Sequence, residues 1–247
     1  MQSIILWLSG HTLVSFAILI YIALFFWLMR FQKKLGITWK EAMLVSLMHV
    51  VIGWSCMELL ALIEAGFDFE KAANIRLYGA IFALPFVYYA WARITARDPK
   101  MVLDIAAICV IFGAISGRMN CFTNGCCEGY PIPFLLAYRW PLREMEMIYY
   151  FLFIFCYAGK IQKGKTWGQV YPAYLIGYGT LRFLSEFVRE EYTGSLGSLH
   201  LAHIWSLIAI AVGTGLYIKI AKEHRSGEVR RKKPGKHPVK KEGGKAI

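Results

Sequence analysis

Three polar side chains recur at a fixed interval within an apolar stretch of the sequence. Tyr178, Arg182 and Glu186 are four residues apart, and Arg189 follows them. In a helix this spacing places the first three on one face. Charged groups in an apolar segment are costly to desolvate unless they face a polar interior. An internal ion pair that ties helices together is one interpretation. The pattern favours another, in which Glu186 orients Arg182 for bidentate binding of a phosphate.

A second polar stretch, Gly117 to Gly129, follows another apolar run and contains Arg118. Its glycines suit a tight loop with close backbone approach, and N–H groups exposed in such a loop can hold an anion. A simple helix exit is the alternative. Taken whole, the stretch predicts an anion site that includes Arg118, Asn124, Gly125 and Gly129.

Three cysteines, Cys121, Cys126 and Cys127, lie within this second stretch. Their spacing is not a usual zinc pattern and no histidine is near in sequence, so no metal is expected. A disulfide that includes Cys121 is possible outside the cell. A reactive thiol is the alternative, because Arg118 would favour the thiolate. A structural or disulfide role is preferred.

The elements that must position these residues are membrane helices. The chain has 247 residues, of which 57% are hydrophobic and 18% charged. The apolar residues form unbroken blocks near the ~20 residues that cross a bilayer. We expect an all-α integral membrane protein with seven transmembrane helices and no large soluble domain. The predicted spans are Ile4–Met29, Ala42–Ile63, Leu77–Ala92, Met101–Ser116, Met147–Ala158, Gly168–Val188 and Leu199–Ile220.

Charge predicts the orientation of these spans. Of the 28 Lys and Arg residues, 21 lie in alternate gaps between the spans or in the C-terminal tail. The positive-inside rule then places the N-terminus outside and the C-terminus inside. The net charge of +12 does not indicate nucleic acid, because it is concentrated in short loops and the tail, where it suits anionic membrane lipids. We expect a membrane domain over 1–222 and a disordered basic cytoplasmic tail over 223–247.

The two polar stretches resemble motifs of the prolipoprotein diacylglyceryl transferase family. One is similar to the family's signature Gly-Arg-x-x-Asn-Phe-x-Asn-Gly-Glu-x-x-Gly, with matches at Gly117, Arg118, Phe122, Asn124, Gly125 and Gly129. The other is similar to Tyr-Gly-x-x-Arg-Phe-x-x-Glu-Phe-x-Arg, with matches at Tyr178, Gly179, Arg182, Phe183, Glu186, Phe187 and Arg189. Weaker matches occur at Arg139, Pro141 and Glu146, and at Ala202, His203 and Ser206.

The resemblance implies a transferase of the bacterial inner membrane. Its donor would be phosphatidylglycerol, and its acceptor the lipobox cysteine in the signal-peptide region of a prolipoprotein. Arg118, Arg182, Glu186 and Tyr78 would be catalytic. Substrate binding would involve Asn124, Gly125, Gly129, Arg139, Tyr178, Arg189 and His203. The scheme needs no cofactor.

The sequence departs from the family at the catalytic histidine. The family's Phe-His-Gly-Gly block corresponds to Leu77-Tyr78-Gly79-Ala80, so a tyrosine stands in its place. Tyr78, Glu186, Glu146 or His11 could serve as the base, and His203 could replace the histidine. Two further hypotheses stay open. One keeps the phosphate site with another donor or acceptor. The other is a non-enzymatic membrane binding or redox module, in which the three cysteines act as a thiol switch or a metal site.

Overall fold

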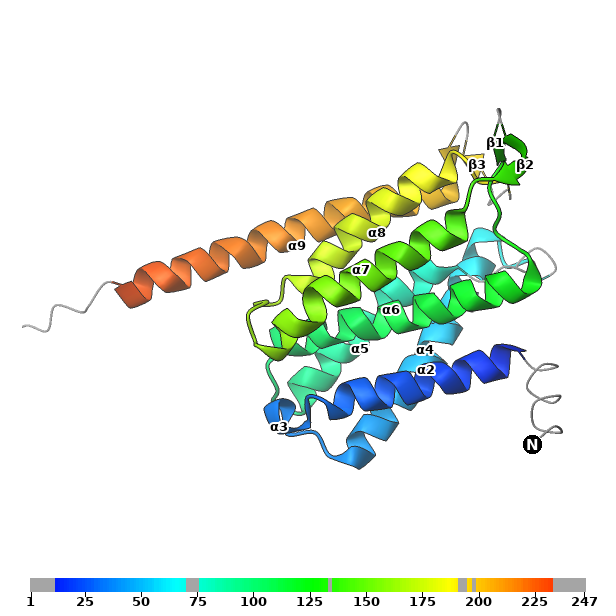
Figure 1. Ribbon diagram of the computed structural model, residues 1–247. Coiled ribbons are helices and arrows are strands. Elements are labelled where there is room, and N and C mark those ends of the chain that lie inside the picture. The colour runs from blue at the N-terminus through cyan, green and yellow to red at the C-terminus, as the bar shows by residue number, and fades with distance from the viewer. Residues whose placement is uncertain (1–11, 70–75, 133–134, 191–194, 197–198, 233–247) are drawn as a thin grey trace, which may run out of the picture.

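The computed structural model describes residues 12–69, 76–132, 135–190, 195–196 and 199–232 (Figure 1). His11 therefore lies outside the described residues. The described part is almost entirely helical. Its helices are α2 (Thr12–Met29), α3 (Gln32–Leu35), α4 (Trp39–Glu64), α5 (Leu77–Ile94), α6 (Pro99–Asn124), α7 (Leu142–Gln162), α8 (Val170–Glu186) and α9 (Leu201–Lys232).

The only strands in the described residues are short. β1 (Pro131–Ile132) pairs antiparallel with β2 (Leu135–Arg139), and β3 (Ser195–Leu196) with β4 (Leu199–His200). The expectation of a helical protein without a large soluble domain is confirmed. Four helices are long and apolar enough to cross a membrane, namely α4, α5, α6 and the part of α9 from Leu201 to Ser226. The count of seven spans stays a prediction.

Helix α6 is the central element of the bundle. It packs against α2, α5, α7 and α8, and an unbroken run of its residues, 104–111, is buried. A helix that is apolar all round is typical of such a position. Helices α8 and α9 approach closely at Gly179 and Gly213, where a Cβ would lie 2.9 Å from Ser206 O and 3.0 Å from Pro172 O, respectively. Small residues at such contacts are characteristic of membrane helix packing.

The loop predicted over Gly117–Gly129 is wrong for its first part, up to Asn124. Helix α6 continues through Arg118 to Asn124, and Gly125 caps it in the left-handed conformation with φ of 66°. No helix breaker follows Gly117 until Gly125, and a left-handed glycine is a common helix terminator. Because the helix uses most of these amide groups in its own hydrogen bonds, they do not form the predicted anion-binding loop. Arg118 contributes through its side chain alone.

The predicted boundary at residue 222 also differs from the structure. Helix α9 continues to Lys232, ten residues beyond it. Lys, Arg and Glu are good helix formers. No proline occurs between Leu201 and Pro234. The rest of the proposed tail lies outside the described residues.

Chain reversal brings several helix ends together. Helices α6 and α8 end, and α7 and α9 begin, at the end of the bundle that carries the strands (Figure 1). A bridge between Gly129 and Arg189 joins the segment after α6 to the segment after α8. Residues that are 60 apart in sequence thus become neighbours there.

Candidate functional site

Three arginines and two glutamates converge where these helix ends meet. Arg118 lies near the end of α6, Glu146 near the start of α7, and Arg182 and Glu186 at the end of α8; Arg189 follows α8. All five residues are at least 90% buried. We call them the arginine cluster. The structure therefore brings together Arg118 and Arg182, which the sequence placed on separate helices.

Glu146 is the shared partner of all three arginines. Its carboxylate accepts two hydrogen bonds from Arg118, with Nε to Oε2 at 2.7 Å and Nη2 to Oε1 at 2.9 Å. Arg182 Nη1 lies 3.5 Å and Arg189 Nη2 3.6 Å from the same Oε1. The Tyr150 hydroxyl donates to Oε2 at 3.2 Å. Arg118 is thus held in the paired, planar geometry that a guanidinium forms with a carboxylate.

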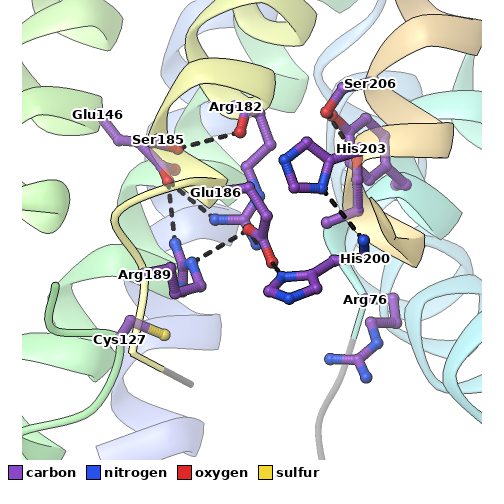
Figure 2. Close-up of polar contacts among 12 residues, drawn as sticks. Arg76, Cys127, Glu146, Arg182, Ser185, Glu186, Arg189, His200, His203 and Ser206 are labelled. Atoms are coloured by element: carbon purple, nitrogen blue, oxygen red, sulfur yellow. Dashed lines mark hydrogen bonds and ion pairs between the residues drawn. The ribbon is translucent and has the colours of Figure 1, made fainter. Parts of the chain in front are cut away.

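Glu186 forms the second anionic centre of the cluster (Figure 2). Its Oε2 lies 3.0 Å from Arg182 Nη2 and 3.3 Å from Arg189 Nε. Its Oε1 lies 3.3 Å from Nδ1 of His200. The four-residue spacing of Arg182 and Glu186 in the sequence is therefore an ion pair in the structure.

Positive charge exceeds negative charge in the cluster. Three guanidinium groups face two carboxylates, which leaves a formal charge of +1. Burial and the charges of Arg182 and Arg118 lower the pKa of Arg189. Three buried donors, Arg182 Nη1, Arg189 Nε and Arg189 Nη2, have no hydrogen-bond partner within the described residues. A buried donor left without a partner costs free energy, so this arrangement suits a further anion with several oxygens.

The remaining residues of the predicted signature surround the cluster without joining it. Asn124 is exposed and donates to Asn120 Oδ1 at 3.1 Å. Gly125 is the helix cap described above. Arg139 binds Glu190 and Glu128 at the surface. None of these three contacts the arginine cluster in the described part of the chain. The substrate-binding roles predicted for Asn124, Gly125 and Arg139 have no support from this geometry.

Gly129 has a structural function that the sequence did not indicate. Its backbone pairs with Arg189, and a Cβ at this position would lie 2.5 Å from the Trp140 Cβ and 2.9 Å from Val188 O. Any side chain would push the Val188–Arg189 backbone outward. Gly129 thus holds Arg189 in the cluster through close backbone packing.

We expect Gly129→Ala to lower the melting temperature of the detergent-solubilised protein and to weaken its binding of anionic lipid, because the methyl group displaces Arg189. Gly117→Ala is the matched control. Its Cβ would meet nothing within 4 Å, and alanine is favoured over glycine in a helix. Fluorescence-detected melting of both variants, with and without phosphatidylglycerol, measures the difference. Equal melting temperatures would contradict this function of Gly129.

Two predicted tyrosines lie beside the cluster. Tyr178 is buried among the rings of Tyr78, Tyr150 and Tyr174. The Tyr78 hydroxyl lies 2.7 Å from Ser206 Oγ. Because the Ser206 hydroxyl donates to Ala202 O at 2.6 Å, Tyr78 donates its proton to Ser206. A phenol engaged as a donor in this way is poorly placed to accept a proton.

Two histidines close the side of the cluster that faces α9. His203 packs its ring against Phe183 and Phe187, and its Nδ1 accepts a hydrogen bond from the His200 backbone N–H at 3.2 Å. His200 contacts Glu186 directly and is partly exposed. The sequence analysis did not identify His200. The Gly- and Ser-rich segment before it has no periodicity from which a neighbour of Glu186 could be predicted.

The three cysteines of the α6 end form a cluster of thiols. Gly125 reverses the chain, the Cys126 N–H donates to Cys121 O at 3.2 Å, and the Sγ atoms of Cys121 and Cys127 lie 3.6 Å apart. Arg118 Nη1 lies 3.8 Å from Cys121 Sγ. The hydrogen bond from Cys121, together with the charges of Arg118 and Arg189, lowers the pKa of Cys127. The cluster is therefore contiguous with the arginines.

A sequence model described as prolipoprotein diacylglyceryl transferase matches residues 3–219. The chain belongs to this family. The match covers the described bundle except the end of α9 after residue 219, and it includes every residue of the arginine cluster. Together with the apolar helices, family membership makes the chain a multi-pass membrane protein.

Curated relatives carry the name phosphatidylglycerol–prolipoprotein diacylglyceryl transferase. One from Clostridium tetani is 27% identical over 150 residues, which cover 56% of this chain and 60% of the relative. One from Methylibium petroleiphilum is 30% identical over 59% of this chain and 61% of its own length. One from Aromatoleum aromaticum is 28% identical over 71% of this chain and 75% of its own length. The chain thus spans about 60% of the length of the first two relatives.

Proposed function

We propose that this protein transfers a diacylglyceryl group from phosphatidylglycerol to the lipobox cysteine thiol of a prolipoprotein. Membership of the family and the names of the relatives support this activity. The observation that carries the proposal is the arginine cluster, in which three guanidinium groups meet at one buried point and keep donors without hydrogen bonds.

The charge of the cluster matches a phosphodiester. A phosphatidylglycerol headgroup carries one negative charge, which would neutralise the formal +1 of three arginines and two glutamates. The donors of Arg182 and Arg189 would gain phosphate oxygens as partners. Guanidinium groups recognise phosphates in this bidentate manner. Glu146 and Glu186 would hold the arginines in place before the lipid arrives, so little reorganisation is needed on binding.

The same groups would stabilise the transition state. The acceptor sulfur attacks the glyceryl carbon that bears the phosphate, a C–S bond forms, and the C–O bond to the phosphate breaks. The electron pair leaves on the oxygen of glycerol phosphate, so negative charge grows beside the arginines. Preorganised cations in a site shielded from water stabilise such charge most strongly.

The acceptor thiol must lose its proton, and His200 is the best placed base among the described residues. Glu186 Oε1 lies 3.3 Å from Nδ1 of His200, a carboxylate–imidazole contact of the kind that orients a histidine for proton transfer. Tyr78 was the base implied by its position in the motif, but its hydroxyl already donates to Ser206. We propose that His200, at the end of β4, replaces the family's histidine.

We expect His200→Gln to lower the turnover number by about 10²-fold, within the range for loss of a general base. Tyr78→Phe should keep activity within a few-fold, because only the bond to Ser206 is lost. His49→Gln is a matched control, since His49 is paired with Tyr88 and does not touch the cluster. Steady-state transfer assays on the three variants decide between the two bases. Inactivity of Tyr78→Phe with an active His200→Gln would reverse the assignment.

The topology follows from the charge distribution and the family. We propose seven spans, with the arginine cluster at the outer face of the inner membrane, the N-terminus outside and the C-terminus inside. The membrane domain would cover 1–222. Residues 223–247 would form the basic cytoplasmic tail, attracted to anionic lipids, and its first ten residues continue helix α9.

The direct experiment is a transfer assay with purified protein. The protein is mixed in detergent with phosphatidylglycerol and a peptide that carries a lipobox cysteine, and the peptide is analysed by mass spectrometry. We expect the added mass of one diacylglyceryl group on the cysteine peptide and none on the same peptide with serine.

The outcome separates the alternative functions. Product from another phospholipid, or on another thiol, would favour a relative with a different donor or acceptor. Absence of any lipid transfer, with loss of function on replacement of the cysteines alone, would favour the thiol module. The excess of guanidinium groups over carboxylates in the arginine cluster favours the transferase over the thiol module, which needs no phosphate site.

A further inference from the structure

The thiols of Cys121, Cys126 and Cys127 are arranged as ligands of one ion. Their three Sγ atoms all lie within 4.8 Å of one another, and those of Cys121 and Cys127 are 3.6 Å apart. Two thiolates on one tetrahedral zinc ion lie about 3.8 Å apart, given a Zn–S bond of about 2.3 Å. A disulfide needs its sulfurs at about 2.05 Å. The observed separation therefore fits a shared metal ion better than a disulfide.

The fold produces this arrangement although the sequence spacing is unusual for zinc. Cys121 lies in the last turn of α6, and the left-handed Gly125 turns the chain back over the helix end. Cys127 itself adopts a positive φ of 63°, a conformation that a non-glycine residue rarely adopts without cause. The backbone conformation thus directs Cys126 and Cys127 toward Cys121.

Positively charged side chains surround the three thiols. Arg118 Nη1 lies 3.8 Å from Cys121 Sγ, and Arg143 Nη1 lies 3.4 Å from the carbonyl oxygens of Cys121 and Cys126. Figure 2 shows the Cys127 thiol beside the side chain of Arg189. Three thiolates and one Zn²⁺ have a net charge of −1, which these guanidinium groups can balance. Soft thiolate ligands select zinc and other thiophilic ions over hard cations.

We propose that Cys121, Cys126 and Cys127 bind one zinc ion through three thiolates, and that the fourth position of this ion receives the thiol of the acceptor substrate. Three protein ligands with one open position are the usual arrangement of a catalytic zinc site. The first half of this inference concerns the chain alone. The second half rests on the proposed transferase function.

Zinc would lower the pKa of the acceptor thiol, so that His200 can take its proton more readily. A thiol that coordinates zinc is deprotonated, and its proton passes to His200. The bound sulfur then attacks the glyceryl carbon and forms the C–S bond. Glycerol phosphate leaves with the electron pair of the broken C–O bond and takes up the proton. The product is a thioether, a weaker ligand than a thiolate, so it leaves the metal and frees the fourth position.

The thiol cluster contacts the arginine cluster, so a bound acceptor sulfur and a bound donor lipid would lie close to each other. Arg118 binds Glu146 through Nε and Nη2, while its Nη1 approaches Cys121. One residue therefore joins the phosphate site to the thiol site. An acceptor sulfur on the metal and a donor phosphate on the arginines would lie on either side of it.

Cobalt is the spectroscopic probe for the site. Full-length protein is purified in detergent under reducing conditions, freed of metal, and titrated with Co²⁺. We expect one Co²⁺ per chain with intense thiolate-to-cobalt charge-transfer absorption, and displacement of this signal by Zn²⁺. Cys121→Ser and Cys127→Ser should each weaken the absorption. Cys156→Ser is the matched control, because Cys156 is exposed on α7, and it should leave the spectrum unchanged.

The second half of the proposal, binding of the acceptor thiol to the metal, is tested on the same cobalt-loaded protein. A lipobox cysteine peptide should intensify the charge-transfer absorption as a fourth sulfur binds, whereas the serine peptide should not. Absence of a thiolate–cobalt spectrum in reduced wild-type protein would overturn the metal site, as would a Cys121–Cys127 disulfide that resists reduction. An unchanged spectrum with the cysteine peptide would overturn acceptor binding.

The failure of this inference is distinguishable from failure of the proposed function. Full transfer activity in metal-free protein would refute acceptor activation by the zinc ion and leave the transferase intact. A cobalt spectrum of the expected kind, in a protein that transfers no lipid to the peptide, would support the metal site and refute the transferase.

Discussion

Replacement of Arg182 by lysine is expected to lower the transfer rate by about 10²- to 10³-fold, the loss typical of one preorganised group that stabilises transition-state charge. Lysine keeps the charge of Arg182, but it cannot contact Glu146 and Glu186 through two separate nitrogens, as Nη1 and Nη2 of Arg182 do. A single ammonium also lacks the planar fork that pairs with two phosphate oxygens. The measurement is the initial rate of diacylglyceryl transfer to the lipobox peptide.

Arg97→Lys is the matched control for this prediction. Arg97 precedes the start of α6, at the end opposite Arg118, and forms a comparable ion pair, with its Nη2 2.9 Å from Glu41 Oε1. Its replacement should leave the rate within about two-fold of wild type, because this ion pair is not part of the arginine cluster. Similar rates for Arg182→Lys and Arg97→Lys would mean that the arginine cluster only ties helices together.

Glu146→Gln is expected to have the largest effect on stability. Glu146 is fully buried and is the one carboxylate shared by all three arginines. Its neutralisation leaves three buried guanidinium groups with Glu186 alone, and breaking such a buried network costs about 3 to 5 kcal/mol. The melting temperature in detergent should fall clearly below that of wild type. Glu41→Gln, which alters a more exposed ion pair, should change it little.

The lipid should partly rescue the Glu146→Gln variant. If the arginine cluster binds phosphate, phosphatidylglycerol supplies the negative charge that the variant lacks, and it should raise the melting temperature of Glu146→Gln more than that of wild type. Diacylglycerol, which has no phosphate, is the control and should give no such difference. Equal stabilisation of both proteins by the two lipids would show that the cluster does not bind the headgroup.

The long-range pairing of the cluster could be predicted only in part from the sequence. The ion pair of Arg182 and Glu186 follows from their four-residue spacing, because helix geometry fixes such contacts. The meeting of Arg118 and Arg182 was predicted from the motifs. The role of Glu146 as their shared partner was not, because it depends on the packing of the start of α7 between the ends of α6 and α8. No local pattern encodes that packing.

Local structure at the end of α6 was predicted less well. The glycines and asparagines of the signature suggested a loop, but the segment from Arg118 to Asn124 is helical. Packing in a bundle overrides weak local propensity, and only the glycine at position 125 ends the helix. The same turn brings Cys126 and Cys127 to Cys121. Sequence rules for zinc ligands assume that a zinc knuckle or a β-hairpin connects the ligands. They therefore do not detect three thiols that a helix end and its capping glycine bring together.

The most direct test of the central claim, that Arg118 and Arg182 hold the phosphate of a glycerophospholipid, is native mass spectrometry of the protein released from detergent that contains phosphatidylglycerol and diacylglycerol. Wild type and Arg97→Gln are expected to retain one phosphatidylglycerol molecule, and Arg118→Gln and Arg182→Gln to retain none above background. Retention of phosphatidylglycerol by both cluster variants at the wild-type level would contradict the account.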